Sequence, residues 1–402
     1  MPTRKSAKRT NEKQPGAGTL SVWAGEQESW WFGSTQVPVA HSVSFGFRNV
    51  DEWLSVAHGK TRGHIYSRNT NPTVAAFEGK VRQLENAEAA TSFSTGMAAI
   101  SNTLFTLLSP GDRVVSVKDT YGGTNKIFVE FLPRFGIHVT LCETTDHREI
   151  EQAIAQGAKL LYLETPTNPT NKILDLARLS ACAHRHSATV VVDNTFATPI
   201  NQQPLKLGAD LVLHSATKFL GGHADAMGGV LCGKRNLVGR IFHFREITGA
   251  ALDPMAAYLL LRGMKTLQLR VRRQNQTALQ VARYLKKHPR ISSVFYPGLP
   301  SHPQYRIARR QMSGFGGVLS FVPSGGFATV KRILHRLRYA HLAANLGAVE
   351  TVAGPPATTS HVESTREERR ASGIPEALIR YSVGIEDPAD LIADLQQALE
   401  IR

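Results

Sequence analysis

Cysteine is scarce in this sequence, and long apolar runs are absent. The 402 residues include three cysteines that lie far apart and form no C-x-x-C pair: Cys142, Cys182 and Cys232. This pattern argues against a disulfide framework or a zinc site, so we expect no metal and a reducing, cytoplasmic location. No apolar stretch approaches the roughly 18 residues that a membrane span needs, so we expect no contact with a membrane.

Acidic residues are outnumbered by basic ones, 32 against 47, which gives a formal net charge of +15. Such an excess can indicate nucleic-acid binding. The basic runs at 270–273, 309–310 and 332–338 stand among leucine, isoleucine and valine at helical spacing, without a zinc-finger or RNA-binding signature. The pattern favours solvated helix faces, with some charge left for anionic ligands, and we expect no nucleic-acid partner.

Apolar residues are almost missing from the first thirteen positions, which contain five basic side chains: Arg4, Lys5, Lys8, Arg9 and Lys13. The hydrophobic middle of a secretory signal is missing as well. We interpret residues 1–19 as a disordered basic tail. An organelle transit peptide is the alternative, because arginine, serine and threonine are present and acids are scarce.

Short β-branched runs alternate with helical stretches between about residues 85 and 235. Strands separated by helices predict βαβ units and an α/β fold with a mostly parallel central sheet. The expected strands are 113–117, 138–141, 159–163, 189–192 and 210–213, and the expected helices are 96–108, 126–135 and 174–186. One long helical stretch at 255–287, followed by short strands such as 317–321 and 378–383, predicts a smaller α+β domain over 255–402.

Polar residues follow three successive strands of the predicted sheet. The first strand ends in the segment 164–169 (ETPTNP), the second in Asp193-Asn194-Thr195, and the third in the segment 214–218 (HSATK). Ligands of open α/β sheets bind at the carboxyl ends of the strands. We therefore expect the three segments to converge on one site.

Lys218 stands out in the third segment, because Ser215 and Thr217 precede it and Gly221-Gly222 follows it. The segment 215–218 has the S-x-x-K form of penicillin-recognising serine enzymes, but the S-D-N and K-T-G elements of those enzymes are missing. A surface lysine is the other alternative. The glycines argue against it, because they indicate a backbone that passes close to another group.

A lysine that attacks a carbonyl must be partly deprotonated, which burial or nearby cations achieve. A Schiff base to pyridoxal phosphate (PLP) also needs an acid opposite the pyridine nitrogen, donors for the phosphate, and an aromatic face over the ring. The chain offers Asp193 as the acid, Ser215, Thr217 and the segment 94–97 for the phosphate, and Tyr121 for the ring. We therefore expect pyridoxal 5'-phosphate as the cofactor.

Seven motifs occur in a recognisable order: YSRNTNPT at 66–73, STGMAA at 94–99, DTYGGT at 119–124, ETPTNP at 164–169, DNTF at 193–196, HSATKFLGGH at 214–223 and RYSVG at 380–384. With them, the chain from about Leu20 onward resembles the Cys/Met metabolism (trans-sulfuration) family of PLP-dependent enzymes. The resemblance implies the aminotransferase-like fold (fold type I). It also implies an N-terminal arm over 20–70 that contributes to the neighbouring subunit's site, and a PLP-binding domain over 71–254.

The resemblance implies a role for each matching residue. Lys218 forms the Schiff base and later acts as the base, Asp193 pairs with the pyridinium, and Tyr121 stacks on the ring and assists proton transfer. Arg380 clamps the substrate α-carboxylate, beside Asn345 and Asn168, and Asn168 also lies near the phenolic oxygen of the cofactor. Further cofactor contacts are implied for Gly96, Met97, Thr195, Ser215 and Thr217, and for Tyr66 and Arg68 of the neighbouring subunit.

The contribution of Tyr66 and Arg68 to a neighbouring site implies a homo-oligomer, at least a dimer and usually a tetramer in this family. Each residue taken singly has a simpler interpretation. Tyr121 could be only a packed aromatic, Asn168 only a turn residue before Pro169, and Arg380 only an ion-pair former. The matched order of motifs favours the functional roles.

The family divides between replacement and elimination at Cγ of an amino-acid substrate. Cystathionine γ-synthases and γ-lyases typically read Glu-Ser-Leu-Gly-Gly where this chain reads ANLGA at 344–348. That segment and PATTSH at 356–361 look more like O-acylhomoserine sulfhydrylases. We therefore expect an O-acylhomoserine to react with sulfide or a thiol and give homocysteine-type products. Methionine γ-lyases usually carry a cysteine where this chain has Gly123, yet a γ-lyase acting on canavanine, methionine or cystathionine, with homoserine or 2-oxobutyrate and ammonia as products, is the alternative.

Three residues near the N-terminus depart from the family pattern: Trp30, Trp31 and His41. The two tryptophans are interpreted as cover for a subunit interface. Alternatively, the three side chains reshape the substrate entrance for an unusual γ-substituted amino acid such as canavanine.

Overall fold

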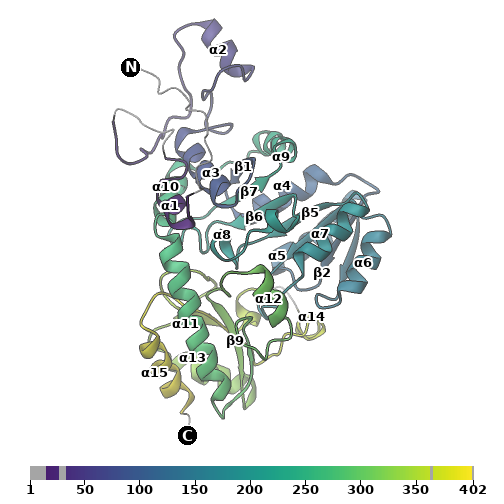
Figure 1. The fold of residues 1–402 in the computed structure, drawn as a ribbon, viewed down its shortest axis with the longest axis vertical. Helices are drawn as coiled ribbons and strands as arrows, with labels where there is room; N and C mark the ends of the chain where they lie inside the picture. Colours follow the sequence, from purple (N-terminus) through teal and green to yellow (C-terminus); the bar gives the residue numbers. More distant parts are fainter. Residues whose placement is uncertain (1–14, 27–32, 363–364, 401–402) are drawn as a thin grey trace.

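The computed structural model describes residues 15–26, 33–362 and 365–400 (Figure 1). Its larger sheet has the strand order β1-β7-β6-β5-β4-β2-β3. Strands β2 to β6 pair in parallel, whereas β7 runs antiparallel between β1 and β6. The expected α/β fold with a mostly parallel sheet is confirmed. The strands are β1 Ala89–Phe93, β2 Arg113–Val117, β3 His138–Cys142, β4 Leu160–Glu164, β5 Thr189–Asp193, β6 Leu211–Ser215 and β7 Gly229–Gly233.

Both faces of this sheet are covered by helices, which explains the continuous apolar runs of β4 and β5. Val190 and Val192 face one core together with α3, α6, α7 and α10, and Val191 faces the other core with α4 and α9. The helices are α3 Pro72–Leu84, α4 Gly96–Leu107, α6 His147–Ala155, α7 Leu176–Arg185, α9 Arg235–Thr248 and α10 Pro254–Met264. With both faces buried, the sheet leaves its strand ends as the place for polar groups.

A second, mostly antiparallel sheet lies below the first in Figure 1, with the order β10-β11-β12-β9-β8. Helices α11, α13 and α15 complete its core. The strands are β8 Ile291–Phe295, β9 Val318–Pro323, β10 His341–Leu342, β11 Val352–Gly354 and β12 Ile379–Ser382, and the helices are α11 Leu267–Lys287, α12 Tyr305–Gln311, α13 Gly326–Arg336, α14 Arg366–Ala371 and α15 Pro388–Leu399. Strands β1 to β7 fall within 71–254 and β8 to β12 within 255–402, which we keep as the proposed domain boundaries.

Two expected helices are interrupted. The stretch 126–135 consists of the end of α5 (Gly122–Lys126), a π-helical turn at Ile127–Phe131 and a 3-10 turn at Leu132–Phe135. Pro133 lies in the last turn, and its ring does not fit a helix interior. The stretch 255–287 divides into α10 and α11, and at this division the carbonyl of Gly263 accepts hydrogen bonds from Arg270 and Thr266.

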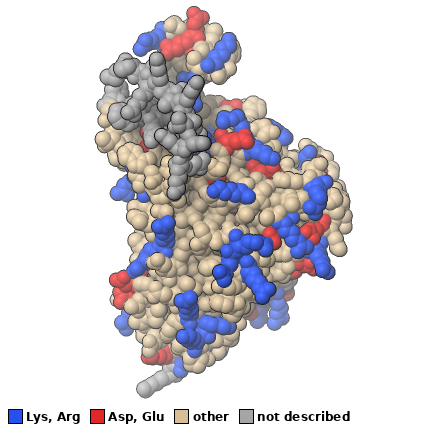
Figure 2. Space-filling view, viewed as in Figure 1, with Lys and Arg blue, Asp and Glu red and all other residues tan. Residues whose placement is uncertain are grey.

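The expectation of solvated basic faces is wrong for Arg270, which is buried on α11. Its guanidinium donates to the carbonyls of Phe219, Leu220 and Gly263. Gly222 has a φ of 71°, and a Cβ there would lie 2.0 Å from Nη1 of Arg270. The glycines after Lys218 therefore allow the chain to turn tightly over a buried cation. Elsewhere, Lys and Arg side chains are spread over the visible face with Asp and Glu between them (Figure 2).

The N-terminal segment, residues 41–68, has no buried residue and stands apart from both sheets at the top of Figure 1. It contains α2 (Val50–Ala57), which has no buried residue. The preceding helix α1 (Ala17–Trp23) instead packs against α3 and α11. The expectation of a disordered tail over 1–19 is therefore wrong for residues 17–19, while residues 1–14 lie outside the described residues. In the part of the chain that the structure describes, no helix is both long and apolar enough to cross a membrane.

Candidate active site

The three polar strand ends converge, as the sequence predicts. Glu164 at the end of β4 lies opposite Asp193 at the end of β5, and β6 ends next to them in Ser215. Together with the start of α4 and with β12 of the smaller sheet, they surround a cavity of about 300 Å³. The predicted site residues that line this cavity are Gly96, Met97, Tyr121, Asn168, Asp193, Thr195, Ser215, Thr217, Lys218 and Arg380.

Lys218 follows β6 by three residues and reaches into the cavity, where Nζ donates a 3.1 Å hydrogen bond to Oδ1 of Asn345. Burial, and secondly the nearby charge of Arg380, lower the pKa of the Lys218 amine to about 8. Desolvation disfavours the ammonium form, and a like charge does the same. A substantial fraction of this amine is thus neutral near pH 8, as a nucleophile or base requires.

Asp193 and Glu164 are two buried carboxyl groups side by side. Burial raises the pKa of both, and repulsion by Asp193 raises the pKa of Glu164 well above its usual range. Asp193 Oδ1 accepts a 2.9 Å hydrogen bond from the backbone of Thr195, while Oε2 of Glu164 accepts a 2.8 Å bond from the backbone of Tyr121. Two carboxylates this close do not both ionise readily, so the pair suits a site that brings a positive charge.

The N-terminus of α4 provides an anion site on another wall. Thr95 caps the helix by accepting from the backbone of Ala98, and Gly96 and Met97 begin it at the cavity. A Cβ on Gly96 would lie 2.7 Å from Cβ of Ser215, so glycine lets the helix approach the end of β6. Helix N-terminal N–H groups and adjacent hydroxyls form a binding site for phosphate.

Arg380 on β12 is buried opposite Lys218. Its Nη1 donates to Oδ1 of Asn168 at 3.2 Å and its Nη2 to the carbonyl of Asn345 at 3.0 Å. Burial lowers the pKa of the guanidinium to about 10. Within the described part of the chain, Arg380 has no ion-pair partner among the acidic residues. A buried guanidinium without a carboxylate is suited to bind one from a ligand.

Nine further residues line the cavity without a role predicted for them: Thr95, Ile100, Glu164, Phe196, Met227, Ala344, Leu346, Thr359 and Ser360. Thr95 and Glu164 lie in the segments 94–97 and 164–169, which were expected at the site. Glu164 also carries a signal of its own, as the first polar residue after an apolar strand. The apolar members carry no such signal, because a leucine on a cavity wall has the same sequence pattern as one in the core.

Three of the predicted residues do not line the cavity. Asn345 contacts Lys218 and Arg380 from behind the wall. Tyr66 and Arg68 lie on the N-terminal segment, where the Arg68 guanidinium stacks 5.4 Å above the Tyr66 ring. His41 is exposed on the same segment, and Trp30 and Trp31 lie outside the described residues.

These residues fit PLP. Lys218 offers an amine of lowered pKa, Asp193 a buried carboxyl, and Tyr121 a half-exposed ring on the cavity wall. The α4 N-terminus with Ser215 and Thr217 offers donors for a phosphate. An aldehyde, a pyridine nitrogen and a phosphate on one ring therefore each find a complementary group.

Comparison with known proteins agrees with this fit. Residues 18–400 match the family model described as Cys/Met metabolism PLP-dependent enzyme. The chain is 43% identical over 391 residues to an L-methionine gamma-lyase from Fusobacterium nucleatum subsp. polymorphum, which covers 96% of this chain and 99% of that protein. It is 40% identical over 386 residues to cystathionine gamma-synthase 1, chloroplastic, from Arabidopsis thaliana, covering 95% of this chain and 69% of that protein.

Solved structures show the same likeness in three dimensions. The crystal structure of cystathionine gamma synthase from Xanthomonas oryzae pv. oryzae, in complex with aminoacrylate and cysteine, matches with a TM-score of 0.91 and 36% sequence identity. The match covers 96% of this chain and 98% of that one. The expected fold type I architecture is confirmed by this similarity.

Proposed function

Because the chain belongs to the Cys/Met metabolism family of PLP-dependent enzymes, we propose that it catalyses replacement or elimination at Cγ of a homoserine-derived amino acid. The reaction that we favour joins an O-acylhomoserine with sulfide or a simple thiol. The carboxylate of the acyl group leaves Cγ, and the sulfur forms a new bond there. The product is homocysteine or a related thioether.

The residues of the cavity wall are the reason for preferring sulfide or a simple thiol as the acceptor. Among the described residues that line it, the acidic groups are Glu164 and Asp193, which sit together at the strand ends. Ala344 is the wall residue where the cystathionine enzymes that the sequence resembles have glutamate. An amino-acid acceptor such as cysteine would bring an ammonium group that needs an acidic partner. Sulfide and simple thiols need none, so an apolar wall at this point favours them.

Each of the proposed catalytic side chains has a separate role in this reaction. Bound PLP supplies an electron sink that makes the Cα and Cβ protons of the substrate acidic. Arg380 binds the α-carboxylate through two parallel hydrogen bonds. The Lys218 amine removes the Cα proton and later returns one, and Oδ1 of Asn345 holds the amine while it is not bonded to the cofactor. Tyr121 assists the proton transfers and covers the ring.

Elimination without an acceptor is the second candidate. It is favoured by the 43% identity to an L-methionine gamma-lyase over nearly the whole chain. In that case water, rather than sulfur, completes the reaction, and a γ-substituted amino acid such as methionine, cystathionine or canavanine gives 2-oxobutyrate and ammonia, or homoserine. Gly123, where methionine γ-lyases usually carry a cysteine, is the feature that separates this chain from the methionine-specific form.

The active unit in this proposal is a homo-oligomer, a dimer of shared sites and usually a tetramer in the family. Tyr66 and Arg68 carry a phenol and a guanidinium that suit a phosphate, yet they do not line the cavity of their own chain. Their segment would complete the phosphate site of a second copy. A reducing cytoplasm is the proposed location, in keeping with the three free cysteines, which are all buried.

Product analysis tests the proposed function. The purified holoenzyme is given O-acetylhomoserine, O-succinylhomoserine, L-methionine or canavanine, with and without sulfide, and products are identified by mass spectrometry. Homocysteine formed from an acylhomoserine, and only with sulfide, supports the favoured reaction. Formation of 2-oxobutyrate or homoserine at the same rate without sulfide establishes the γ-lyase instead.

A matched variant tests the reasoning about the wall. Ala344→Glu restores an acid beside the cavity, and we expect it to raise the ratio of cystathionine to homocysteine when cysteine and sulfide compete. An unchanged product ratio would show that position 344 does not select the acceptor.

A further inference from the structure

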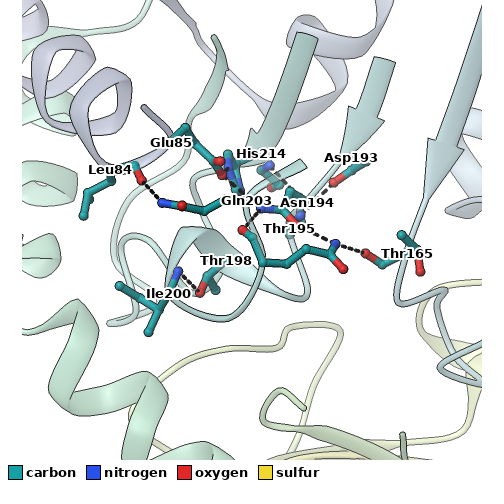
Figure 3. A network of polar contacts seen from close by, with 12 residues as sticks. Leu84, Glu85, Thr165, Asp193, Asn194, Thr195, Thr198, Ile200, Gln203 and His214 are labelled. Carbon is teal, nitrogen blue, oxygen red and sulfur yellow. Dashed lines mark hydrogen bonds and ion pairs between the residues drawn. The ribbon is translucent and has the colours of Figure 1, made fainter. Parts of the chain in front are cut away.

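A polar network is buried behind the active site (Figure 3). His214 Nε2 and Glu85 Oε1 are 2.7 Å apart, and the same oxygen accepts a 2.9 Å hydrogen bond from Nδ2 of Asn194. Gln202 donates to Oδ1 of Asn194 and to the carbonyl of Thr165. The proposed mechanism uses none of these side chains, and no role was predicted for Glu85 or for His214, although His214 begins the motif at 214–223.

Both members of the pair are removed from solvent. Glu85 and His214 each have 0% relative exposure. Oε1 of Glu85 therefore has two polar neighbours, His214 and Asn194, and a carboxyl group in this position without polar partners would be very costly. Among the described residues, His214 is the one basic group in an ion pair with Glu85. The carboxyl group and the imidazole therefore depend on each other inside the protein.

Each member of the pair has a second polar atom that is left without a hydrogen bond. Oε2 of Glu85 and Nδ1 of His214 have no hydrogen-bond partner among the described residues. A buried ion pair with unsatisfied atoms is a poor way to stabilise a core, and apolar residues of similar size are often better. The pair thus calls for an explanation other than the stability of the fold.

The position of the network suggests that it supports the active site. His214 lies in β6 between Leu213, which is opposite Asp193 in the sheet, and Ser215, which lines the cavity. Asn194 directly follows Asp193, and Asp193 accepts its 2.9 Å hydrogen bond from Thr195 on the other side of Asn194. Successive side chains of a strand point to opposite faces, so the network fixes the turn 193–195 from the face opposite the cavity.

We propose that Glu85 and His214 are positioning residues of the active site, which hold the Asp193 carboxylate in place and ionised for the ring nitrogen of PLP. Two paths lead from the pair to Asp193. The mechanical path runs from Glu85 through Asn194 to the backbone of the turn. The electrostatic path is direct, because positive charge on His214 acts to lower the pKa of Asp193 across the dry edge of the sheet.

Electrostatics within the chain support the second path. Burial raises the pKa of Asp193, and the positive charge of His214 acts against this rise together with the hydrogen bonds from Thr195. Burial and the charge of Asp193 raise the pKa of the neighbouring Glu164, on which no cation comparable to His214 acts among the described residues. The pair therefore helps to decide which of the two adjacent carboxyl groups carries the negative charge.

The proposal rests on the placement of PLP in the proposed function, but not on the identity of the amino-acid substrate. The test accordingly measures the cofactor first. Two variants, Glu85→Gln and His214→Gln, remove the charge and keep a polar side chain of similar length. The control is Asp394→Asn, which alters a buried carboxylate of α15 that accepts hydrogen bonds from the backbone of Arg338 and Tyr339, in the smaller domain.

Four properties are measured for each protein: the dissociation constant for PLP, the visible circular dichroism of the bound cofactor, the melting temperature, and kcat and KM for the amino-acid substrate. We expect both site variants to weaken PLP binding about 10-fold, the effect of losing one interaction with a charged group. We also expect an altered cofactor dichroism, and a fall in kcat with little change in KM, because Arg380 is untouched. The Asp394→Asn control should melt earlier without any of these changes.

A purely structural role for the pair would give a different result. If Glu85→Gln and His214→Gln lower the melting temperature as the control does, but leave PLP affinity and cofactor dichroism unchanged, the pair is a purely structural element and the proposal is wrong. Since PLP binding requires no substrate, failure of the proposed acylhomoserine reaction would leave this result intact. Should His214→Gln fail to fold, Glu85→Gln alone decides the matter.

Discussion

The N-terminal segment exposes apolar side chains, whereas the strand ends of the large sheet bury even polar ones. In the segment, Val50 is 66% exposed and Trp53 51% exposed, and the Trp53 ring stacks on Phe47 of the same segment, with centroids 5.8 Å apart. In β4, every residue is buried, including the carboxyl group of Glu164. Strand β4 is therefore packed completely within one chain, whereas the N-terminal segment exposes apolar groups as large as tryptophan.

The N-terminal segment and the rest of the chain also differ in the proposed catalytic and cofactor-binding residues that they contain. The body of the protein, from α3 onward, brings Lys218, Asp193 and Arg380 together, so the proposed reacting groups come from one chain. Tyr66 and Arg68 are exposed on the segment and contact each other rather than the cavity. We expect changes in the body to affect the reaction itself, and changes in the segment to affect cofactor retention and assembly.

Replacing the lysine gives the largest expected effect. Lys218→Ala removes the proposed base and attachment point, and we expect a loss of turnover of more than about 1000-fold. The absorbance of covalently bound PLP should vanish as well. Lys206→Ala, at an exposed lysine of the same domain, serves as the control and should retain full activity. Substantial turnover by Lys218→Ala would mean that the reacting groups are elsewhere.

Arg380→Lys is the second largest change within the body. Lysine keeps the charge but cannot form two parallel hydrogen bonds to a carboxylate, and we expect KM for the amino-acid substrate to rise about 10- to 100-fold. The affinity for PLP should change little. Steady-state kinetics and a PLP titration measure the two effects separately. A large loss of PLP affinity with a normal KM would move Arg380 from the substrate to the cofactor.

A change in the N-terminal segment should have a smaller effect of a different kind. Arg68→Ala removes one charge-assisted contact to the phosphate, and we expect PLP to bind about 10-fold more weakly. At saturating PLP, kcat should be near that of the unmodified protein. Equilibrium dialysis and kinetics at high PLP check this. If kcat falls at saturating PLP while affinity is unchanged, the segment contributes to the reaction and the contrast with the body fails.

The smallest effect concerns pH. Burial and the charge of Arg380 lower the pKa of the Lys218 amine to about 8, so its reactive neutral form increases as pH rises through that value. We expect the rate of PLP attachment to the cofactor-free protein to rise about fivefold between pH 7 and 8 and then to level off. Stopped-flow absorbance measures this rate. A rate that keeps rising to about pH 10 would indicate a lysine with its ordinary pKa.

The sequence predicted the site best where chemistry and strand order coincide. Polar residues after the apolar runs at 159–163, 189–192 and 210–213 indicated one edge of one sheet, and the structure brings them together. The antiparallel strand β7 was missed, because its five residues begin and end with glycine. A strand in that position is determined by its neighbours β1 and β6 more than by its own residues.

Contacts between residues far apart in the sequence could not be predicted from it. Arg270 was assigned to a solvated face from helical spacing, but it lies under the loop after Lys218, about 50 residues away in the sequence. Glu85 and His214 are 129 residues apart and became a pair only in the fold. The hydrogen bond between Arg380 and Asn168 likewise joins residues that are 212 positions apart, while the place of Asn168 beside the cofactor's phenolic oxygen stays a prediction. No local pattern encodes such pairings.

Subunit complementation tests the division between body and segment most directly. Lys218→Ala and the double variant Tyr66→Ala/Arg68→Ala are each assayed alone, at a PLP concentration that saturates only the unmodified protein, and then after they have been unfolded and refolded together. If sites are shared between subunits, a mixed dimer has one site with both an intact lysine and an intact segment, and the mixture should recover roughly a quarter of the normal activity. If the mixture is no more active than the two variants apart, each chain builds its site alone and the account of the N-terminal segment is wrong.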